Sequence, residues 1–224
     1  MTAATIVFDL DGTLIDTAPD LVDTLNIIFA RERLPPVPYD VARNLIGGGA
    51  RAMIARGIEA DGRTVAAADL DRLFAEFIEY YTAHIADRSQ PFPGAVDAMD
   101  ALAAGGARFA VCTNKLERLS VLLLDKLGLA SRFAVICGQD TFGMAKPEPE
   151  ILRRTVAAAG GDISRAVMVG DSLTDIRTAR AAGVPVIAVD FGYSDKPVSH
   201  FAPDRLIEHF SQLPAAINTV LARK

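Results

Sequence analysis

The sequence predicts an α/β fold, a doubly wound parallel sheet into which an α-helical cap domain is inserted. Short apolar runs alternate with stretches of helical length over most of the chain, a pattern typical of βαβ units. One long segment near the N-terminus interrupts the alternation and has helical periodicity throughout. Acidic, hydroxyl or basic side chains follow four of the apolar runs. Because ligands bind beyond the carboxyl ends of parallel strands, these side chains predict a site at one edge of the sheet.

Five short apolar runs, rich in β-branched residues, are expected to form the strands. Because turn-forming residues bound them and they are almost continuously apolar, we expect strands that are buried on both faces. They cover residues 5–8, 109–112, 134–137, 166–169 and 185–189. Helices are expected at about residues 95–105, 116–128, 148–160, 173–182 and 210–222.

About seventy residues after the first strand contain no convincing strand. Their apolar residues fall at helical spacing in two stripes, a short one that begins at Leu21 and a broad one from Leu70 to Ile85. The sequence Pro-Phe-Pro-Gly at 91–94 then marks the return to the sheet. We therefore predict a helical cap domain at residues 16–88 and an α/β core made of residues 1–15 and 89–224.

The charge balance argues against a nucleic-acid partner. The 224 residues include 23 Lys and Arg against 28 Asp and Glu, a net charge of -5, whereas nucleic-acid binders need a basic face. No apolar run reaches the ~18 residues of a membrane span, and the first residues lack the basic region of a signal peptide. Cys112 and Cys137 are expected to be buried, inert thiols. We expect a cytoplasmic monomer or homodimer that contacts neither nucleic acid nor membrane.

Two acids follow the first strand, in the segment Asp9-Leu10-Asp11-Gly12-Thr13. An ordinary polar turn would explain Asp and Gly here, but two carboxylates this close repel unless a cation intervenes. A bound Mg²⁺ would keep Asp9 ionised and leave Asp11 free to carry a proton. A nucleophile beside a general acid/base is what phosphoryl transfer through an aspartyl-phosphate requires.

The second and third strands end in residues that could extend this site. Thr113 and Asn114 could cap the next helix or bind a phosphate at its N-terminus, and these roles are compatible. Lys146 stands just before a predicted helix start at Pro147, where a cation opposes the helix dipole. A residue that is unfavourable for the local helix but stands after a strand indicates a functional role. We therefore expect Lys146 to neutralise Asp9 and the transferring phosphoryl group.

The fourth strand is followed by a further pair of acids. Ser172 and Asp175 have the spacing of a capping box, which leaves Asp171 unexplained. Asp171 could complete a set of oxygen ligands for Mg²⁺ together with Asp9, and Asp175 could support those ligands without binding the ion. The segments after four successive strands are therefore expected to form one site.

Taken in chain order, the segment Asp9–Thr13, Thr113, Lys146 and the segment Gly170–Asp175 resemble the four motifs of the haloacid dehalogenase (HAD) superfamily. The resemblance spans the whole chain, and the helical insert resembles the cap of that superfamily. It implies a HAD-like, Rossmannoid core. It also implies that Asp9 becomes the phosphoaspartate, and that Asp11 protonates the leaving alkoxide and then activates water.

The same resemblance implies roles for the other motif residues. Thr113, with Asn114, would bind phosphoryl oxygens, and Lys146 would stabilise their charge. The Mg²⁺ ion would be held by the Asp9 carboxylate, the backbone carbonyl of Asp11 and Asp171, which makes Asp11 both a catalytic and a metal-binding residue.

Two further segments, LIDTAPDL at 14–21 where the predicted cap begins and LIGGGA at 45–50 within it, resemble phosphoglycolate phosphatases. The Gly-rich stretch could be a flexible break between helices. It could instead close over the site, so that backbone N–H groups near Gly48, together with Arg51, meet a substrate carboxylate. The implied reaction belongs to carbohydrate metabolism. It is the Mg²⁺-dependent hydrolysis of a small anionic phosphate monoester, phosphoglycolate, to glycolate and phosphate.

Other functions remain open at this point. A sugar-phosphate or nucleotide phosphatase, or a phosphosugar mutase, would keep the same catalytic residues. A non-catalytic phosphate-binding protein is disfavoured because a binder needs no nucleophile such as Asp9. A dehalogenase is disfavoured because those relatives lack an acid at the place of Asp11. A dinucleotide oxidoreductase is disfavoured because no G-x-G-x-x-G follows the first strand.

Overall fold

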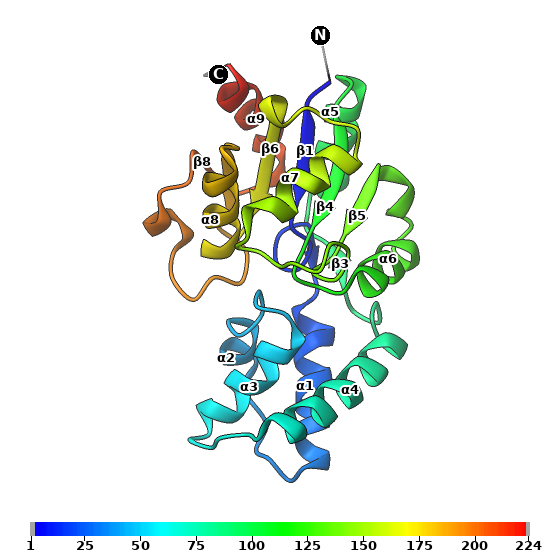
Figure 1. Ribbon diagram of the computed structural model, residues 1–224, viewed down its shortest axis with the longest axis vertical. Helices are drawn as coiled ribbons and strands as arrows, with labels where there is room; N and C mark the ends of the chain where they lie inside the picture. The colour runs from blue at the N-terminus through cyan, green and yellow to red at the C-terminus, as the bar shows by residue number, and fades with distance from the viewer. Residues whose placement is uncertain (1–2, 223–224) are drawn as a thin grey trace.

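A computed structural model describes residues 3–222 and shows a six-stranded parallel sheet with helices α1–α4 gathered beyond one end of it (Figure 1). The strands lie in the order β5-β4-β1-β6-β7-β8. This arrangement confirms the predicted α/β fold class. The strand bounds are β1 Thr5–Phe8, β4 Arg108–Cys112, β5 Val135–Cys137, β6 Ala166–Gly170, β7 Val186–Val189 and β8 Arg205–Ile207.

The edge strand β8 was not predicted. It is three residues long, and its sequence Arg-Leu-Ile contains no apolar run that would distinguish it from a loop. Pairing with β7 forms it, through a register that aligns Ala188 with Leu206. Tertiary contact rather than local pattern therefore decides this strand.

Alternating side chains divide the core into two packed layers, one on each face of the sheet. On β1, Ile6 and Phe8 pack into one layer and Val7 into the other. Helices α7 and α8 cover the side of Val7, and α5, α6 and α9 cover the opposite side. The helix bounds are α5 Ala95–Ala104, α6 Glu117–Lys126, α7 Pro149–Ala158, α8 Leu173–Ala182 and α9 Leu213–Leu221.

Helices α1–α4 form a separate layer that faces the carboxyl ends of the strands (Figure 1). The two predicted apolar stripes lie on α1 and α4, which pack on each other through buried residues such as Leu25 and Phe77. Helix α3 approaches α1 closely, since a Cβ on Gly57 would lie 2.9 Å from the Phe29 ring. All four helices fall within the predicted insert, while its limits at residues 16 and 88 stay a prediction. The bounds are α1 Ala18–Arg31, α2 Tyr39–Arg43, α3 Ala50–Ala60 and α4 Ala67–Ala83.

The two chain segments that join these helices to the sheet lie side by side. Their short strands, β2 (Ile15–Asp16) and β3 (Gln90–Pro91), pair antiparallel. Asp20, buried in the first turn of α1, accepts hydrogen bonds of 2.6–3.1 Å from the backbone N–H groups of Arg88 and Ser89 and from the Ser89 hydroxyl. Asp20 therefore fastens the outgoing linker to the returning one. Within residues 3–222, no helix has the length and apolar character needed to cross a membrane.

Asp20→Ala is expected to lower the free energy of unfolding by about 2–4 kcal/mol, because it leaves buried backbone N–H groups without an acceptor. Asp23→Ala is the matched control on the same helix. Asp23 is half-exposed and pairs with the Arg88 guanidinium at 3.0 Å, so its loss should change stability by less than about 1 kcal/mol. Urea unfolding followed by circular dichroism measures both, and equal small losses would contradict the role given to Asp20.

Candidate functional site

The candidate active site is a small cavity between the carboxyl ends of the strands and helices α1–α4. Its volume is about 40 Å³, which is room for a few water molecules. Polar groups of the sheet face an apolar wall from the cap. The polar lining includes Asp9, Asp11, Thr113, Asn114 and Lys115, and the apolar wall includes Met53, Phe74, Phe77 and Ile78.

Asp9 follows β1 directly and is buried against a lysine. One of its oxygens accepts a hydrogen bond from the Leu10 backbone N–H at 2.7 Å and lies 2.9 Å from Lys146 Nζ. The same ammonium donates to Asp175 at 2.6 Å. The Lys146 and Asp175 side chains are 1% and 0% exposed. A fully buried cation thus lies between two buried carboxylates. Buried charges need such partners of opposite charge, because they have lost the stabilisation that water provides.

The structure corrects the reason that we gave for Lys146. Helix α7 begins at Pro149 with Glu148 as its N-cap, not at Pro147, so Lys146 precedes the first turn and the helix dipole does not explain it. Asn114 fixes its backbone instead. The Asn114 side-chain oxygen accepts from the Lys146 N–H at 2.8 Å, and its nitrogen donates to the Lys146 carbonyl at 3.2 Å.

Asp175 both caps α8 and holds Lys146. The predicted capping box with Ser172 is confirmed. One Asp175 oxygen accepts from the Ser172 N–H at 3.1 Å and from its hydroxyl at 2.6 Å, while the other faces Lys146. A Cβ at Gly170 would lie 2.4 Å from the Asp175 side chain, so the end of β6 needs glycine there.

Asp171 is held from both sides. One oxygen accepts from the Thr13 hydroxyl at 3.0 Å, and the other accepts from the Tyr193 backbone N–H at 2.7 Å. Gly12 lies against it with a φ of 79°, and a Cβ there would be 2.6 Å from an Asp171 oxygen. Both the left-handed backbone and the close approach require glycine in the Asp9–Thr13 turn.

Three of these acids could hold a metal ion, since one oxygen each of Asp9, Asp171 and Asp175 lies within 4.8 Å of the others. Burial raises the pKa of Asp9 to about 6, against the effect of Lys146, and raises the pKa of Asp171 to about 7, with added repulsion from the neighbouring acids. A divalent cation would offset that repulsion, and carboxylate oxygens are suitable ligands. Asp175 has the Lys146 ammonium on one oxygen and two Ser172 donors on the other, whereas the donors to Asp171 are single and uncharged. Asp9 and Asp171 therefore fit the cation best.

The Asp11 carboxylate turns away from this cluster. Lys115 Nζ donates to its two oxygens at 2.9 and 3.0 Å, and the Thr17 hydroxyl donates at 2.8 Å. Any metal contact from Asp11 would therefore come from its backbone carbonyl, and that role stays a prediction.

The structure rules out helix capping as the reason for Thr113 and Asn114. Helix α6 begins at Glu117 with Leu116 as its N-cap, without a side-chain cap. Thr113 is buried in the cavity wall, and its hydroxyl accepts from the Lys115 N–H at 3.2 Å. Phosphate binding by these two residues stays a prediction, and the amide of Asn114 already has backbone partners.

The two predicted cap residues lie outside the cavity. Gly48 lines a larger hollow of about 580 Å³ between α2 and the start of α8, whereas its neighbours Gly47 and Gly49 line the cavity. Arg51, about half-exposed, pairs with Asp71 on α4. In this structure Arg51 does not reach Asp9 or Asp11, because α3 starts immediately after Gly49 and its first turn carries Arg51 outward.

Sequence reasoning missed Lys115 and Tyr81. Lys115 stands in the turn after β4, where a lysine is usually exposed, yet its side chain is 5% exposed. Tyr81 belongs to the apolar stripe of α4 and lines the same cavity. The Lys115 ammonium lies 4.7 Å from the centre of the Tyr81 ring, a distance typical of a cation–π contact. Only packing of the cap on the core brings this pair together.

Tyr193 connects the metal-binding candidates to the cap. Its hydroxyl donates to Asp16 at 2.5 Å and accepts from the Ala18 N–H at 2.9 Å, while its own N–H binds Asp171. The Arg43 guanidinium of α2 lies 5.2 Å from its ring centre. One residue thus contacts a candidate metal ligand, the first linker and a cap helix.

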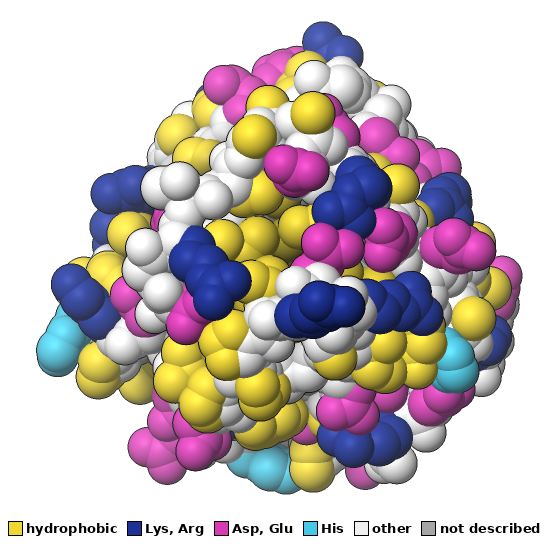
Figure 2. Space-filling view, turned by 90° about the horizontal axis from the view of Figure 1, so that it is seen from below, with side chains coloured by type: hydrophobic (Ala, Val, Ile, Leu, Met, Phe, Trp, Pro, Cys, Tyr) yellow, Lys and Arg dark blue, Asp and Glu magenta, His cyan; other side chains and the backbone are white. Residues whose placement is uncertain are grey.

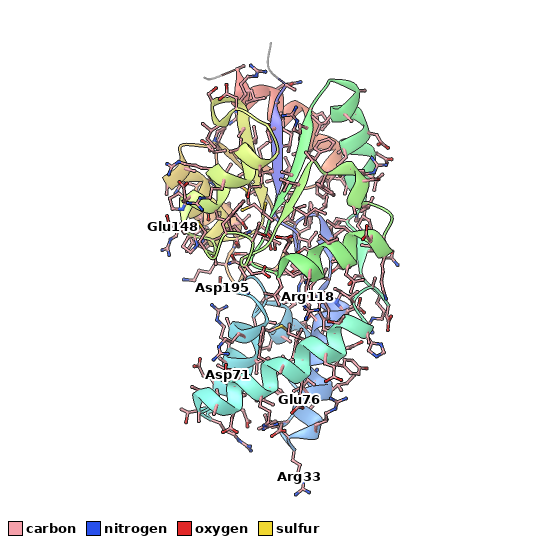
Figure 3. All side chains as sticks on the ribbon, turned by 45° about the vertical axis from the view of Figure 1, so that its right-hand side comes forward. Arg33, Asp71, Glu76, Arg118, Glu148 and Asp195 are labelled. Carbon is pink, nitrogen blue, oxygen red and sulfur yellow. The ribbon has the colours of Figure 1, made fainter. Side chains whose placement is uncertain are left out.

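Charged side chains of both signs surround the cap end of the molecule. Figure 2 shows Lys and Arg interspersed with Asp, Glu and hydrophobic groups on this face. In Figure 3, Arg118 and Asp195 lie on the core near the cap, and Arg33 lies at the far end of the cap. Positive, negative and hydrophobic side chains are mixed on this face, whereas proteins that bind nucleic acids present a continuous basic face.

Known proteins resemble this chain in sequence and in fold. A family model described as haloacid dehalogenase-like hydrolase matches residues 6–189. A phosphoglycolate phosphatase of Caulobacter vibrioides is 49% identical over 99% of this chain and 93% of its own length. One of Mesorhizobium japonicum is 48% identical over 100% and 98%. A crystal structure of a predicted phosphoglycolate phosphatase from Haemophilus somnus has a TM-score of 0.89 at 26% identity, covering 96% of this chain and 98% of that one.

Divalent-cation binding at Asp9 and Asp171 is expected to tighten as the pH rises from about 5.5 to about 7.5. Burial raises the pKa of Asp9 to about 6 and that of Asp171 to about 7. At low pH a cation must displace protons from both acids, whereas at high pH they are already ionised and fewer protons have to leave. Calorimetric titration with Mg²⁺ in two buffers of different protonation enthalpy measures affinity and proton release. Asp171→Asn should weaken binding and flatten its pH dependence. An affinity that is constant over this range would contradict the assignment.

Proposed function

The chain belongs to the haloacid dehalogenase-like hydrolases, and from that premise we propose that it is a magnesium-dependent phosphatase that converts phosphoglycolate to glycolate and phosphate through an aspartyl-phosphate. The observation that carries the proposal is the position of Asp9, a buried carboxylate 2.9 Å from Lys146 and two residues from a second acid in the same cavity. The substrate is that of the relatives that match nearly the whole chain at 48% and 49% identity.

In the first half-reaction, an oxygen of Asp9 attacks phosphorus as the bond from phosphorus to the glycolate oxygen breaks. Lys146 offsets the negative charge of Asp9 and of the phosphoryl oxygens. Thr113, in the cavity wall, donates its hydroxyl to a phosphoryl oxygen. Asp11 gives a proton to the leaving alkoxide, so that glycolate departs as the alcohol.

In the second half-reaction, water attacks the phosphorus of the aspartyl-phosphate. Asp11, which has lost its proton, takes one from this water as the bond between phosphorus and Asp9 breaks. Phosphate leaves, and Asp9 is again a carboxylate beside a protonated Asp11. One ester and one water have become one alcohol and one phosphate.

Asp9 and Asp171 would hold Mg²⁺, with the backbone carbonyl of Asp11 as a further ligand. The bound ion would offset the charge that develops on the phosphoryl group. Thr13 and Tyr193 orient the Asp171 carboxylate for this task through their hydrogen bonds.

Substrate entry requires the cap to move. A cavity of about 40 Å³ has room for a few water molecules but not for a phosphate ester. The β2–β3 linkers are the two connections about which α1–α4 would swing. Closure would then separate the aspartyl-phosphate from bulk water.

Asp9→Asn is expected to lower phosphate release by about 1000-fold or more, because an amide is too weak a nucleophile to attack phosphorus. Asp125→Asn is the matched control, since Asp125 is exposed on α6 and should keep full activity. Phosphate release is measured by a colorimetric assay, with urea unfolding to confirm that both variants fold. Substantial turnover by Asp9→Asn would exclude Asp9 as the nucleophile.

A panel of phosphate esters is expected to give the highest kcat/KM for phosphoglycolate, with hexose phosphates and mononucleotides at least about tenfold lower. EDTA should abolish turnover and added Mg²⁺ should restore it. A preference for hexose phosphates would instead support a sugar-phosphate phosphatase. An isomerised sugar phosphate among the products would support a mutase.

A further inference from the structure

Besides Lys146, the site holds a second buried ammonium, Lys115, which lines the cavity. The reaction above does not explain its task. Lys146 lies between two acids, Asp9 and Asp175. Lys115, 5% exposed, has the Asp11 carboxylate as its charge partner, and an anion beside it stabilises its buried charge. If Asp11 turns to the leaving oxygen, another anion must take its place at Lys115.

A second hydrogen-bond donor faces the same space from the cap. The Tyr81 side chain is 1% exposed and lines the cavity. The neighbouring Lys115 ammonium can only donate to its oxygen, so within residues 3–222 the Tyr81 O–H has no acceptor for its own proton. Burial raises the pKa of Tyr81 to about 12, although the Lys115 charge works in the other direction, so the hydroxyl keeps its proton. A buried donor without an acceptor is rare in folded proteins and points to a ligand that supplies one.

The position of Lys115 limits where that anion lies in the substrate. Asp11 must come within hydrogen-bond distance of the leaving oxygen to protonate it, and Lys115 Nζ is itself 2.9–3.0 Å from Asp11. Because Asp11 reaches the leaving oxygen by turning its carboxylate about its own side-chain bonds, the ammonium lies little farther than two hydrogen-bond lengths, ~6 Å, from that oxygen. A carboxylate attached to the ester carbon is two bonds from that oxygen and falls within this range.

We propose that Lys115 and Tyr81 form a subsite for a carboxylate on the ester carbon of the substrate, and that this subsite selects phosphorylated 2-hydroxy acids over phosphate esters of uncharged alcohols. The inference rests on the proposed function and names the residues that recognise the substrate. The carboxylate replaces Asp11 at Lys115, which leaves Asp11 to face the leaving oxygen. Because Lys115 belongs to the core and Tyr81 to α4, the subsite is complete only when the cap is closed.

Phosphoglycolate and ethyl phosphate are the substrates that test the subsite, since they differ only in a carboxylate against a methyl group. For the unaltered enzyme, kcat/KM should be higher for phosphoglycolate. Lys115→Met should reduce this preference by about 10- to 100-fold, the effect of losing a hydrogen bond to a charged group. Tyr81→Phe keeps the ring and should reduce the preference by about 3- to 10-fold.

Lys126→Met is the matched control, because Lys126 is exposed at the end of α6 and should leave the preference unchanged. Equal losses on both substrates in Lys115→Met would show that Lys115 only holds Asp11, and would overturn the proposal. Loss of the preference in Arg51→Met but not in Lys115→Met would move the carboxylate to the cap loop and also overturn it.

Binding without turnover provides a second measurement if Lys115→Met is inactive. In an Asp9→Asn background, calorimetry should show tighter binding of phosphoglycolate than of ethyl phosphate, and adding Lys115→Met should remove the difference. An unchanged difference would refute the subsite. Failure of the proposed function has another signature, in which the unaltered enzyme prefers a hexose phosphate or a nucleotide over both test substrates.

Discussion

The buried contact of Lys146 with Asp9 and Asp175 is the interaction on which the rest of the site depends. Asp9 directly follows β1, Lys146 lies in the segment between β5 and α7, and Asp175 lies in the first turn of α8. Each side chain is almost fully removed from solvent. Without the ammonium, two carboxylates would be left uncompensated in a low-dielectric interior, which proteins avoid by protonation. Lys146 therefore favours the carboxylate form of Asp9 in this buried place, as the proposed phosphoryl transfer requires.

That contact is itself held by hydrogen bonds that extend to the cap. Asn114 binds the backbone of Lys146 on one side and reaches the Gly47 carbonyl on the other, at 3.4 Å. Tyr193 links Asp171 to the first linker. Consequently the position of α1–α4 and the orientation of the acids are not independent. A movement of the cap would therefore change the surroundings of these acids.

Much of this could be predicted because parallel strands leave a simple pattern. Four strand-end segments were identified from apolar runs and from the polar residues after them, and the sheet brings all four to one edge. The pattern failed where local and tertiary explanations compete. Thr113 and Asn114 looked like helix caps, and Pro147 looked like a helix start, but α6 and α7 begin two or more residues later. A strand as short as β8 carries no local signal that separates it from a loop.

The sequence by itself determined the α/β fold, the helical insert and the acids with their lysine, because strand periodicity and the order of motifs are local properties. Only the tertiary structure decided which cation faces which acid. Arg51 looked suited to a substrate carboxylate, yet it pairs with Asp71 on the outside of the cap, while Lys115 is buried against Asp11. No spacing along the chain encodes that choice, because it depends on how the face of α4 that carries Tyr81 packs over the end of β4.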